Sequence, residues 1–264
     1  MKLIQTSPLL GCLILFCSVA AAAQDEDPRF TISAGAEYTT GTYGGETDIE
    51  DFYVPLKATM DFRRLSFRLT VPYLSVRAPA GTVITGPGGE PIPGTGEIVT
   101  NSGIGDVIAS VTVLDVIRNR RLGFAMDLTG KVKFGTADVD KGLGTGENDF
   151  TVQADFLKFA DRVTWIGSIG YKFRGQPPGA VLDDAFLASA GGIYKLTRDM
   201  RTGMFFDYRE SSIGADPAQE LSVFLSNRLG SDWRIQVFAF KGFTDSSADW
   251  GGGIHVKRYL RALN

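Results

Sequence analysis

The stretch EDFYVPLKATMDF, residues 50–62, alternates between apolar and polar side chains with a period of two. Phe52, Leu56 and Met60 share one side, whereas Lys57 and Asp61 share the other. A period of two predicts a β-strand, because successive side chains of a strand point to opposite faces of its sheet. In a soluble sheet protein the apolar face points inward, whereas in a membrane barrel it points to lipid. The rest of the chain has to decide between the two.

The start of the chain has the features of a secretory signal peptide. A basic residue, Lys2, precedes an apolar run over 9–20, and small residues follow up to Ala23, after which we predict cleavage. An uncleaved membrane anchor is the weaker interpretation, because the apolar run is short. Lipid attachment at Cys17 is also weaker, because the bulky Phe16 precedes it where a small residue is wanted.

Cleavage would remove 1–23 and leave 24–264 as a single domain. Cys12 and Cys17 leave with the signal peptide, so the exported chain has to be stable without disulfides. The full chain has a net charge of −3, and losing Lys2 makes the exported part more negative, so nucleic acid is not an expected partner. No apolar run in 24–264 is long enough for a membrane-spanning helix.

Alternating segments of about 10 to 14 residues recur along the exported chain, long enough for tilted membrane strands. We expect strands near 29–42, 50–62, 65–77, 104–116, 121–135, 149–159, 162–174, 184–196, 200–210, 219–229, 232–243 and 249–260. The links between them alternate in length. The short links are 63–64, 116–120, 160–161, 197–199 and 230–231, and the long links are 43–49, 78–103, 137–148, 176–183, 211–218 and 244–248. This asymmetry is typical of outer-membrane barrels with an even strand number. The sequence therefore predicts an all-β protein: a closed antiparallel transmembrane β-barrel of twelve strands, with short periplasmic turns and longer extracellular loops.

The two faces of these strands differ in polarity. The apolar face is expected to place these aromatic residues against lipid: Phe52, Phe67, Phe124, Phe134, Phe150, Trp165, Phe173, Phe186 and Phe206. The opposite, pore-lining face is expected to carry Glu37, Lys57, Asp61, Arg68, Asp106, Asp127, Lys131, Lys133, Asp155, Lys172, Arg174, Lys195, Arg201, Asp207, Arg209, Arg228, Arg234 and His255. A Lys or Arg that faces lipid at the bilayer midplane costs about 2–4 kcal/mol, which explains the bias. The alternative is a solvated face of a soluble sheet protein.

The second and third segments can be paired residue by residue. A two-residue turn between them places Asp61 opposite Ser66 and Pro55 opposite Pro72. Arg68 then lies diagonally from Asp61, so we expect an ion pair. Two facing prolines each remove a ladder donor, so we also expect a bulge or a water molecule in the lumen there, unless the register is shifted.

Several Gly-Asp patterns resemble a known family. They are SGIGDV at 102–107, GKVKFGTADVDKGLGTGENDF at 130–150, WIGSIGYKF at 165–173, GGIYKLTRDMRTGMFFDYRES at 191–211, LSNRLGSDW at 225–233 and GFTDSSADWGGGI at 242–254. With these patterns the chain resembles outer-membrane barrel proteins of the "MetA-pathway of phenol degradation" type. The resemblance implies a twelve-stranded barrel that moves small molecules, aromatic or hydrophobic ones among them, and it implies no catalytic residue.

Catalytic and ligand-binding motifs are sparse. His255 is the only histidine, and a hydrolase acting on lipids at the barrel rim could use it with a serine, although no triad motif supports this. Asp138 and Asp140 have the spacing of a calcium loop, but Gly142 and Leu143 stand where that loop needs a ligand and a glycine. We therefore expect no enzyme activity, no cofactor and no metal.

The charges suggest how a channel would work. Basic residues outnumber acidic ones on the expected inner face, whereas acidic residues concentrate in the long links. We therefore expect a passive outer-membrane channel that favours anionic or polar aromatic solutes, with the Gly- and Pro-rich link 78–103 folded over or into the mouth. The expected partners are a small-molecule solute, outer-membrane lipids and lipopolysaccharide bridged to acidic loops by divalent ions. The alternatives are the rim lipid hydrolase and a closed structural barrel.

Overall fold

The computed structural model describes residues 28–86 and 89–260, so the expected signal peptide, 1–23, lies outside the described residues. The strands are β1 (Arg29–Gly41), β2 (Ile49–Asp61), β3 (Leu65–Pro79), β4 (Ile98–Ile104), β5 (Ile108–Asn119), β6 (Phe124–Lys133), β7 (Asp149–Ala160), β8 (Val163–Phe173), β9 (Ala185–Lys195), β10 (Met200–Arg209), β11 (Ala218–Leu229), β12 (Trp233–Gly242) and β13 (Trp250–Leu260). Within the described ranges, no helix has the length and apolarity needed to cross a membrane.

These strands form one closed barrel. Each strand pairs antiparallel with its neighbours, β13 pairs with β1, and β2 pairs with both β1 and β3, so the sheet has no open edge at this point. Both β4 and β5 pair with β3, β4 along 73–79 and β5 along 65–70. They share one position in the wall, and the barrel therefore has twelve strand positions. The predicted fold class is confirmed.

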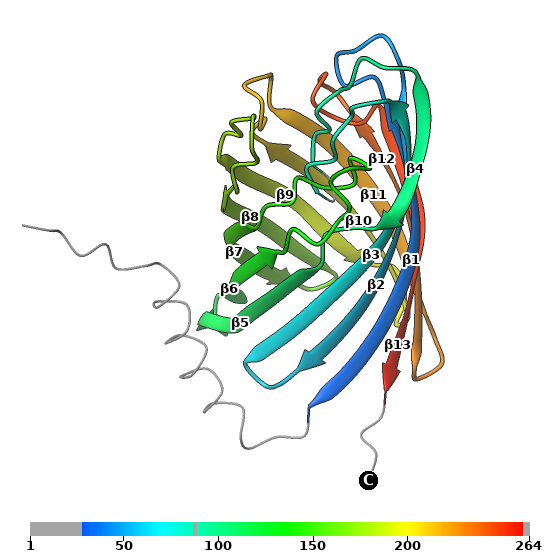
Figure 1. Ribbon diagram of the computed structural model, residues 1–264. Helices are drawn as coiled ribbons and strands as arrows, with labels where there is room; N and C mark the ends of the chain where they lie inside the picture. The colour runs from blue at the N-terminus through cyan, green and yellow to red at the C-terminus, as the bar shows by residue number, and fades with distance from the viewer. Residues whose placement is uncertain (1–27, 87–88, 261–264) are drawn as a thin grey trace, which may run out of the picture.

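The connections differ in length at the two ends of the barrel. Short turns join β2 to β3, β5 to β6, β7 to β8, β9 to β10 and β11 to β12, and β1 begins and β13 ends at this same end. The long links, including 80–97, 134–148 and 174–184, lie at the opposite end (Figure 1). The predicted alternation of short and long links is confirmed, although strand ends differ by a few residues from the predicted ones.

The first hairpin has the predicted register but not the predicted irregularity. Asp61 pairs with Ser66 and Pro55 with Pro72, and the β2–β3 ladder continues without a register shift. The β2–β3 ladder therefore contains no bulge, and the water molecule expected as the alternative stays a prediction. Pairing is interrupted instead on the far side of each proline: the β1–β2 ladder skips 35–36, and the wall beside Pro72 is broken at 105–107. Because proline has no N–H to donate, its missing hydrogen bond falls where these neighbouring ladders are already open.

The predicted ion pair between Arg68 and Asp61 is also wrong. The Asp61 carboxylate accepts a hydrogen bond from the Ser66 hydroxyl at 2.6 Å, directly across the ladder. Among the described residues, no carboxylate oxygen lies within 4.0 Å of the Arg68 guanidinium. The directly opposed serine thus takes the place of the diagonal arginine.

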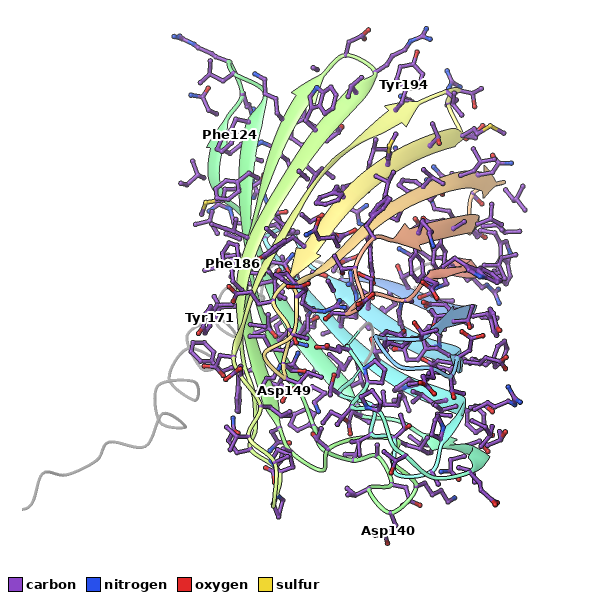
Figure 2. The ribbon with its side chains drawn as sticks, turned by 90° about the horizontal axis from the view of Figure 1, so that it is seen from above. Phe124, Asp140, Asp149, Tyr171, Phe186 and Tyr194 are labelled. Carbon is purple, nitrogen blue, oxygen red and sulfur yellow. The ribbon has the colours of Figure 1, made fainter. Side chains whose placement is uncertain are left out.

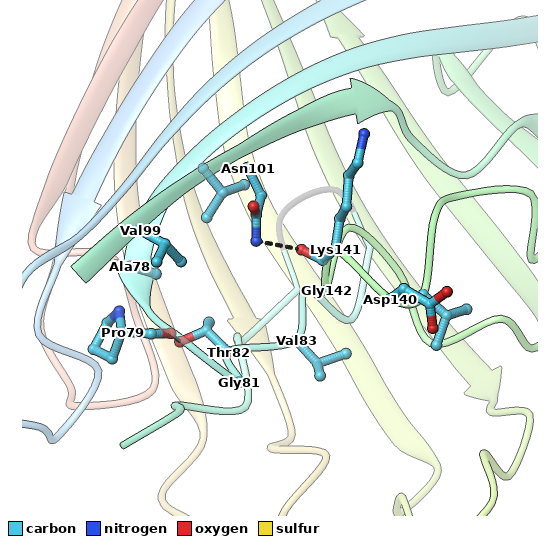
Figure 3. Close-up of a pocket in the computed structure, with 12 residues that line it drawn as sticks. Ala78, Pro79, Gly81, Thr82, Val83, Val99, Asn101, Asp140, Lys141 and Gly142 are labelled. Atoms are coloured by element: carbon cyan, nitrogen blue, oxygen red, sulfur yellow. Dashed lines mark hydrogen bonds between the residues drawn. The ribbon is translucent and has the colours of Figure 1, made fainter. Parts of the chain in front are cut away.

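The fourth wall position is interrupted, which the sequence pattern did not show. We expected one strand over 104–116, but β4 ends at Ile104 and β5 begins at Ile108. Val99 and Asn101 of β4 border a small pocket of about 100 Å³ with 139–142 of the β6–β7 link, and the Asn101 side-chain amide donates a hydrogen bond to the Lys141 carbonyl at 2.9 Å (Figure 3). In this way the β6–β7 link covers the edge of β4 that no strand of the described chain pairs with.

The outer face of the wall is apolar. The ladders place eight of the nine predicted lipid-facing aromatic residues on one face, and Trp165 has 57% of its surface exposed there. The ninth, Phe134, directly follows the last residue of β6 and belongs to no ladder of the described chain. Figure 2 shows Phe124, Tyr171 and Phe186 projecting outward from the wall, with Asp140 at the long-loop end and Tyr194 at the other end. Exposed rings around a closed wall are expected for a barrel in lipid, because there the apolar face has no core to pack against.

Candidate functional site

The polar face of the wall is the inner face. One cavity of about 160 Å³ is lined by Glu37 of β1, Asp51 of β2, Arg209 of β10 and Glu220 of β11. β2 and β10 are not neighbours in the sheet, so their side chains can meet only inside the barrel. Residues that pair across a ladder point to the same face of the sheet, so the pairing registers show which side chains of every other strand also face inward.

Most of the predicted pore-lining residues lie on this inner face by register. They are Glu37, Lys57, Asp61, Arg68, Asp127, Lys131, Lys133, Asp155, Lys172, Lys195, Arg201, Asp207, Arg209, Arg228, Arg234 and His255. Asp106 and Arg174 lie outside the strands: Asp106 is in the break between β4 and β5, and Arg174 directly follows β8. Lys195, Arg201 and Arg228 are exposed near the short turns, far from the cavity.

The link 80–97 folds into the mouth of the barrel. Val83 and Ile92 form an isolated bridge, and the Ile84 amide donates to the Gly142 carbonyl at 2.9 Å. At the opposite wall, the buried Glu90 carboxylate accepts hydrogen bonds from the Ser211 hydroxyl at 2.7 Å and from the backbone N–H of residue 212 at 3.2 Å. A segment that leaves β3 is therefore anchored between β10 and β11 and crosses the lumen (Figure 1).

A buried charge cluster holds the break in the wall. The Lys133 ammonium lies 2.9 Å from an Asp106 carboxylate oxygen and 3.4 Å from one of Asp149, and it donates to the Thr145 hydroxyl at 3.3 Å. The second Asp106 oxygen accepts from the Ala137 amide at 3.0 Å. Sequence analysis placed Lys133 and Asp106 in the pore lining, but both are buried beneath the β6–β7 link, where they join β6 and β7 to the interrupted strand.

Charges of opposite sign collect on different parts of the inner wall. Glu37, Asp51 and Glu220 line the cavity, whereas Lys172 and Arg174, at the end of β8, interact electrostatically with Arg209. Arg209 is the only basic residue among the described residues that line the cavity, and its guanidinium lies 3.9 Å from a Glu220 carboxylate oxygen. The basic excess that the sequence indicated is thus not spread evenly over the inner face.

Two groups outside the strands respond to these surroundings. Burial raises the pKa of the Tyr43 hydroxyl above its ordinary value, and the nearby Glu220 and Asp51 carboxylates raise it further. Burial lowers the pKa of the Arg174 guanidinium, while Asp149 acts in the opposite direction. Tyr43 therefore stays a neutral hydrogen-bonding group at the cavity.

His255 is held by an acid and not by a serine. Its Nε2 atom hydrogen-bonds with a Glu37 carboxylate oxygen at 2.8 Å, and its ring meets Phe238 edge-on at 5.4 Å between centroids. No hydrogen bond links His255 to a serine hydroxyl in the described part of the chain. This geometry gives the rim hydrolase no support, because a nucleophile within hydrogen-bond reach of the histidine is what that chemistry needs.

Inward-facing aromatic rings form a feature that sequence analysis missed. Phe205 and Phe224 stack at 6.4 Å between centroids, and Phe224 pairs across the ladder with Phe238. Glycines lie under these rings: a Cβ on Gly203 would come within 2.4 Å of the Phe224 ring, and one on Gly191 within 2.5 Å of the Phe205 ring. The rings therefore lie against the wall instead of filling the lumen. The cross-strand pairing of glycine with phenylalanine was the signal that could have revealed them.

The calcium-loop spacing of Asp138 and Asp140 can be compared with the structure of this loop. Within residues 28–86 and 89–260, no group of three or more His, Cys, Asp or Glu side chains is placed to hold a metal ion. Asp138 instead forms an ion pair with Lys141 at 3.7 Å, and its other oxygen accepts from the Lys141 amide at 3.3 Å. The expected bridging of lipopolysaccharide to the acidic loops by divalent ions stays a prediction.

A closed twelve-position wall, apolar outside and charged inside, defines the class of outer-membrane-type β-barrels. A family model described as "Putative MetA-pathway of phenol degradation" matches residues 57–259. This chain belongs to that family.

Three solved structures of similar fold are an outer membrane channel and two porins. The chain is similar to the COG4313 outer membrane channel from Pseudomonas putida F1, with 11% identity, a TM-score of 0.67, and 89% of this chain and 96% of that chain covered. It is also similar to the NanC porin, with 8% identity, a TM-score of 0.56 and coverage of 87% and 99%, and to the KdgM porin, with 9% identity, a TM-score of 0.55 and coverage of 88% and 99%. At these identities the similarity shows the fold alone. A comparison with curated proteins finds no match.

Proposed function

We propose that this protein is a passive outer-membrane channel for small solutes that carry an aromatic or anionic group. The single observation that carries the proposal is a closed wall whose inner face is charged and partly aromatic, and whose mouth is crossed by an anchored loop. Ionised and aromatic groups on an inner wall can replace part of a solute's hydration as it passes. Membership in the family and similarity of fold to channels and porins support the proposal.

The loop 80–97 sets access in this proposal. Val83 and Ile92 form a β-bridge, so the two ends of the segment 83–92 lie side by side. This segment can therefore be excised and Thr82 joined to Pro93 with little strain. We expect purified protein in planar bilayers to conduct ions, and the excised variant to conduct at least about twice as well, because the segment that crosses the lumen is gone. Removal of 178–181 from the exposed β8–β9 link is the matched control and should leave conductance unchanged.

Four results would count against parts of this function. A bilayer that contains folded protein but carries no current would favour the closed structural barrel. Hydrolysis of phospholipid that His255→Ala abolishes would favour the rim enzyme. Equal conductance before and after excision of 83–92 would remove the loop from the permeation path, and a reversal potential that favours cations would remove the anion preference.

Export is part of the same proposal. The signal-peptide pattern before Gln24 implies that the protein crosses the inner membrane and folds in the outer membrane. Mass spectrometry of the membrane-extracted protein is expected to give a chain that begins at Gln24. A chain that retains 1–23 would contradict this part.

A further inference from the structure

The cavity beneath the link 80–97, here called the inserted loop, has the size of a small-molecule site. Its volume of about 160 Å³ equals roughly five water molecules at about 30 Å³ each. Ile84, Gly86, Gly89 and Pro91 of the inserted loop form one side of the cavity, and the barrel wall forms the others. A solute entering past the loop meets this cavity at the mouth.

One side of the cavity is suited to an ammonium group. Glu37 is already engaged by His255, but the buried Oδ1 atom of Asp51 has no hydrogen-bond partner, and no cationic nitrogen of the described chain lies within 4.0 Å of the Asp51 carboxylate. Tyr43, Tyr53 and Phe240 line the same cavity. Carboxylates beside aromatic faces attract organic cations, and a buried acceptor without a partner is costly until a donor arrives.

The other side is suited to an acidic group. Arg209 reaches the cavity from β10, and the Arg174 guanidinium, directly after β8, adds to its positive potential. Arg174 is 7% exposed, yet its Nε, Nη1 and Nη2 atoms have no hydrogen-bond partner. The structure thus leaves two groups of this region without a hydrogen-bond partner among the described residues: the Oδ1 atom of Asp51, which lines the cavity, and the guanidinium of Arg174, which lies outside the cavity lining.

We propose that this cavity binds small zwitterions, with the ammonium group at Asp51 and the acidic group facing Arg209. The inference rests on the proposed channel function and names its solute class. A zwitterion provides a partner for both charges without changing the net charge of the site. An anion alone would meet the carboxylates of Glu37, Asp51 and Glu220, and a cation alone would add nothing to the single ion pair that Arg209 makes with Glu220.

The test is block of single-channel current by four probes of matching shape. They are 4-aminobutanoate, which is a zwitterion; 4-aminobutanamide, a cation; pentanoate, an anion; and pentanamide, which is neutral. A solute that binds in the cavity interrupts the ion current, so the concentration for half-block reports its affinity. We expect half-block by 4-aminobutanoate at a concentration at least about tenfold below that of the other three. One additional charge-assisted hydrogen bond accounts for a difference in affinity of about this size.

Two variants that each remove one charge assign the two ends of the ligand. Asp51→Asn should weaken block by 4-aminobutanoate about tenfold and leave pentanoate unchanged, whereas Arg209→Gln should weaken 4-aminobutanoate and leave 4-aminobutanamide unchanged. Asp61→Asn is the matched control, because Asp61 lies on the same strand and face as Asp51 but at the short-turn end, outside the cavity, so the half-block concentrations of the four probes should stay the same.

The outcomes separate this inference from the channel function. If the cation or the anion blocks as well as the zwitterion, or if Asp51→Asn has no more effect than Asp61→Asn, the zwitterion site is refuted while the channel stands. If the folded protein carries no current under any condition, the channel function is refuted and the inference falls with it.

Discussion

Replacement of Lys133 by methionine tests whether the buried charge cluster holds the interrupted wall together. The side chains of Lys133, Asp106 and Asp149 are 7%, 1% and 5% exposed, so solvent screens their interactions little. Lys133→Met keeps most of the side-chain volume but leaves two buried carboxylates without their shared cation. Breaking a buried ion pair by removing one partner costs about 3–5 kcal/mol. At a urea slope of about 3 kcal/mol/M, the unfolding midpoint should fall by roughly 1–1.7 M.

Urea unfolding in lipid vesicles, followed by tryptophan fluorescence, measures this midpoint. Lys131→Met is the matched control, because Lys131 lies on the same strand and face two residues earlier and no carboxylate oxygen of the described chain lies within 4.0 Å of its ammonium group. Its loss should change the free energy of unfolding by less than about 1 kcal/mol. The reasoning fails if the two variants unfold at the same urea concentration.

Two further predictions concern the faces of the wall. Gly203→Ala should lower conductance, because the new Cβ would lie 2.4 Å from the Phe224 ring and would push that ring into the lumen. Gly130→Ala should conduct like the original protein, because no atom of the described chain outside the two flanking residues lies within 4 Å of the new Cβ. An equal loss of conductance in both variants would refute the displacement of the Phe224 ring. Leu56→Lys should lower the free energy of unfolding in vesicles by about 2–4 kcal/mol, since Leu56 is 56% exposed on the outer face near the middle of β2. If Leu56→Ala lowers the free energy of unfolding by a similar amount, the loss does not come from placing a charge in lipid.

The inserted loop explains why the charged inner face of the barrel includes a cavity. The Glu90 carboxylate of the loop 80–97 accepts a hydrogen bond from the Ser211 hydroxyl on the opposite side of the mouth. The same loop forms one side of the cavity that Asp51 and Arg209 line. Without the loop these residues would line an open lumen. The physical consequence is a small enclosed volume in which charges are less screened than in a wide water-filled pore.

Local properties of the sequence determined the fold class and the faces of the strands. The period of two in 50–62 assigns each side chain to a face, and the cost of a charge in lipid decides which face points outward. The register of Pro55 opposite Pro72 followed from the turn length alone and is confirmed. These features depend on residues close in sequence, so the chain reveals them without knowledge of its distant contacts.

Only the tertiary structure decided how the interior is organised. At the break between β4 and β5, Asp106 pairs with Lys133 of β6, which also contacts Asp149 of β7. The hydrogen bond of Glu90 to Ser211 joins residues 121 positions apart. The meeting of acidic and basic side chains in one cavity depends on which strands face each other across a closed wall. Closure of the barrel, and not any local pattern, sets these distances, and that is why the sequence indicated a basic lumen but not a divided one.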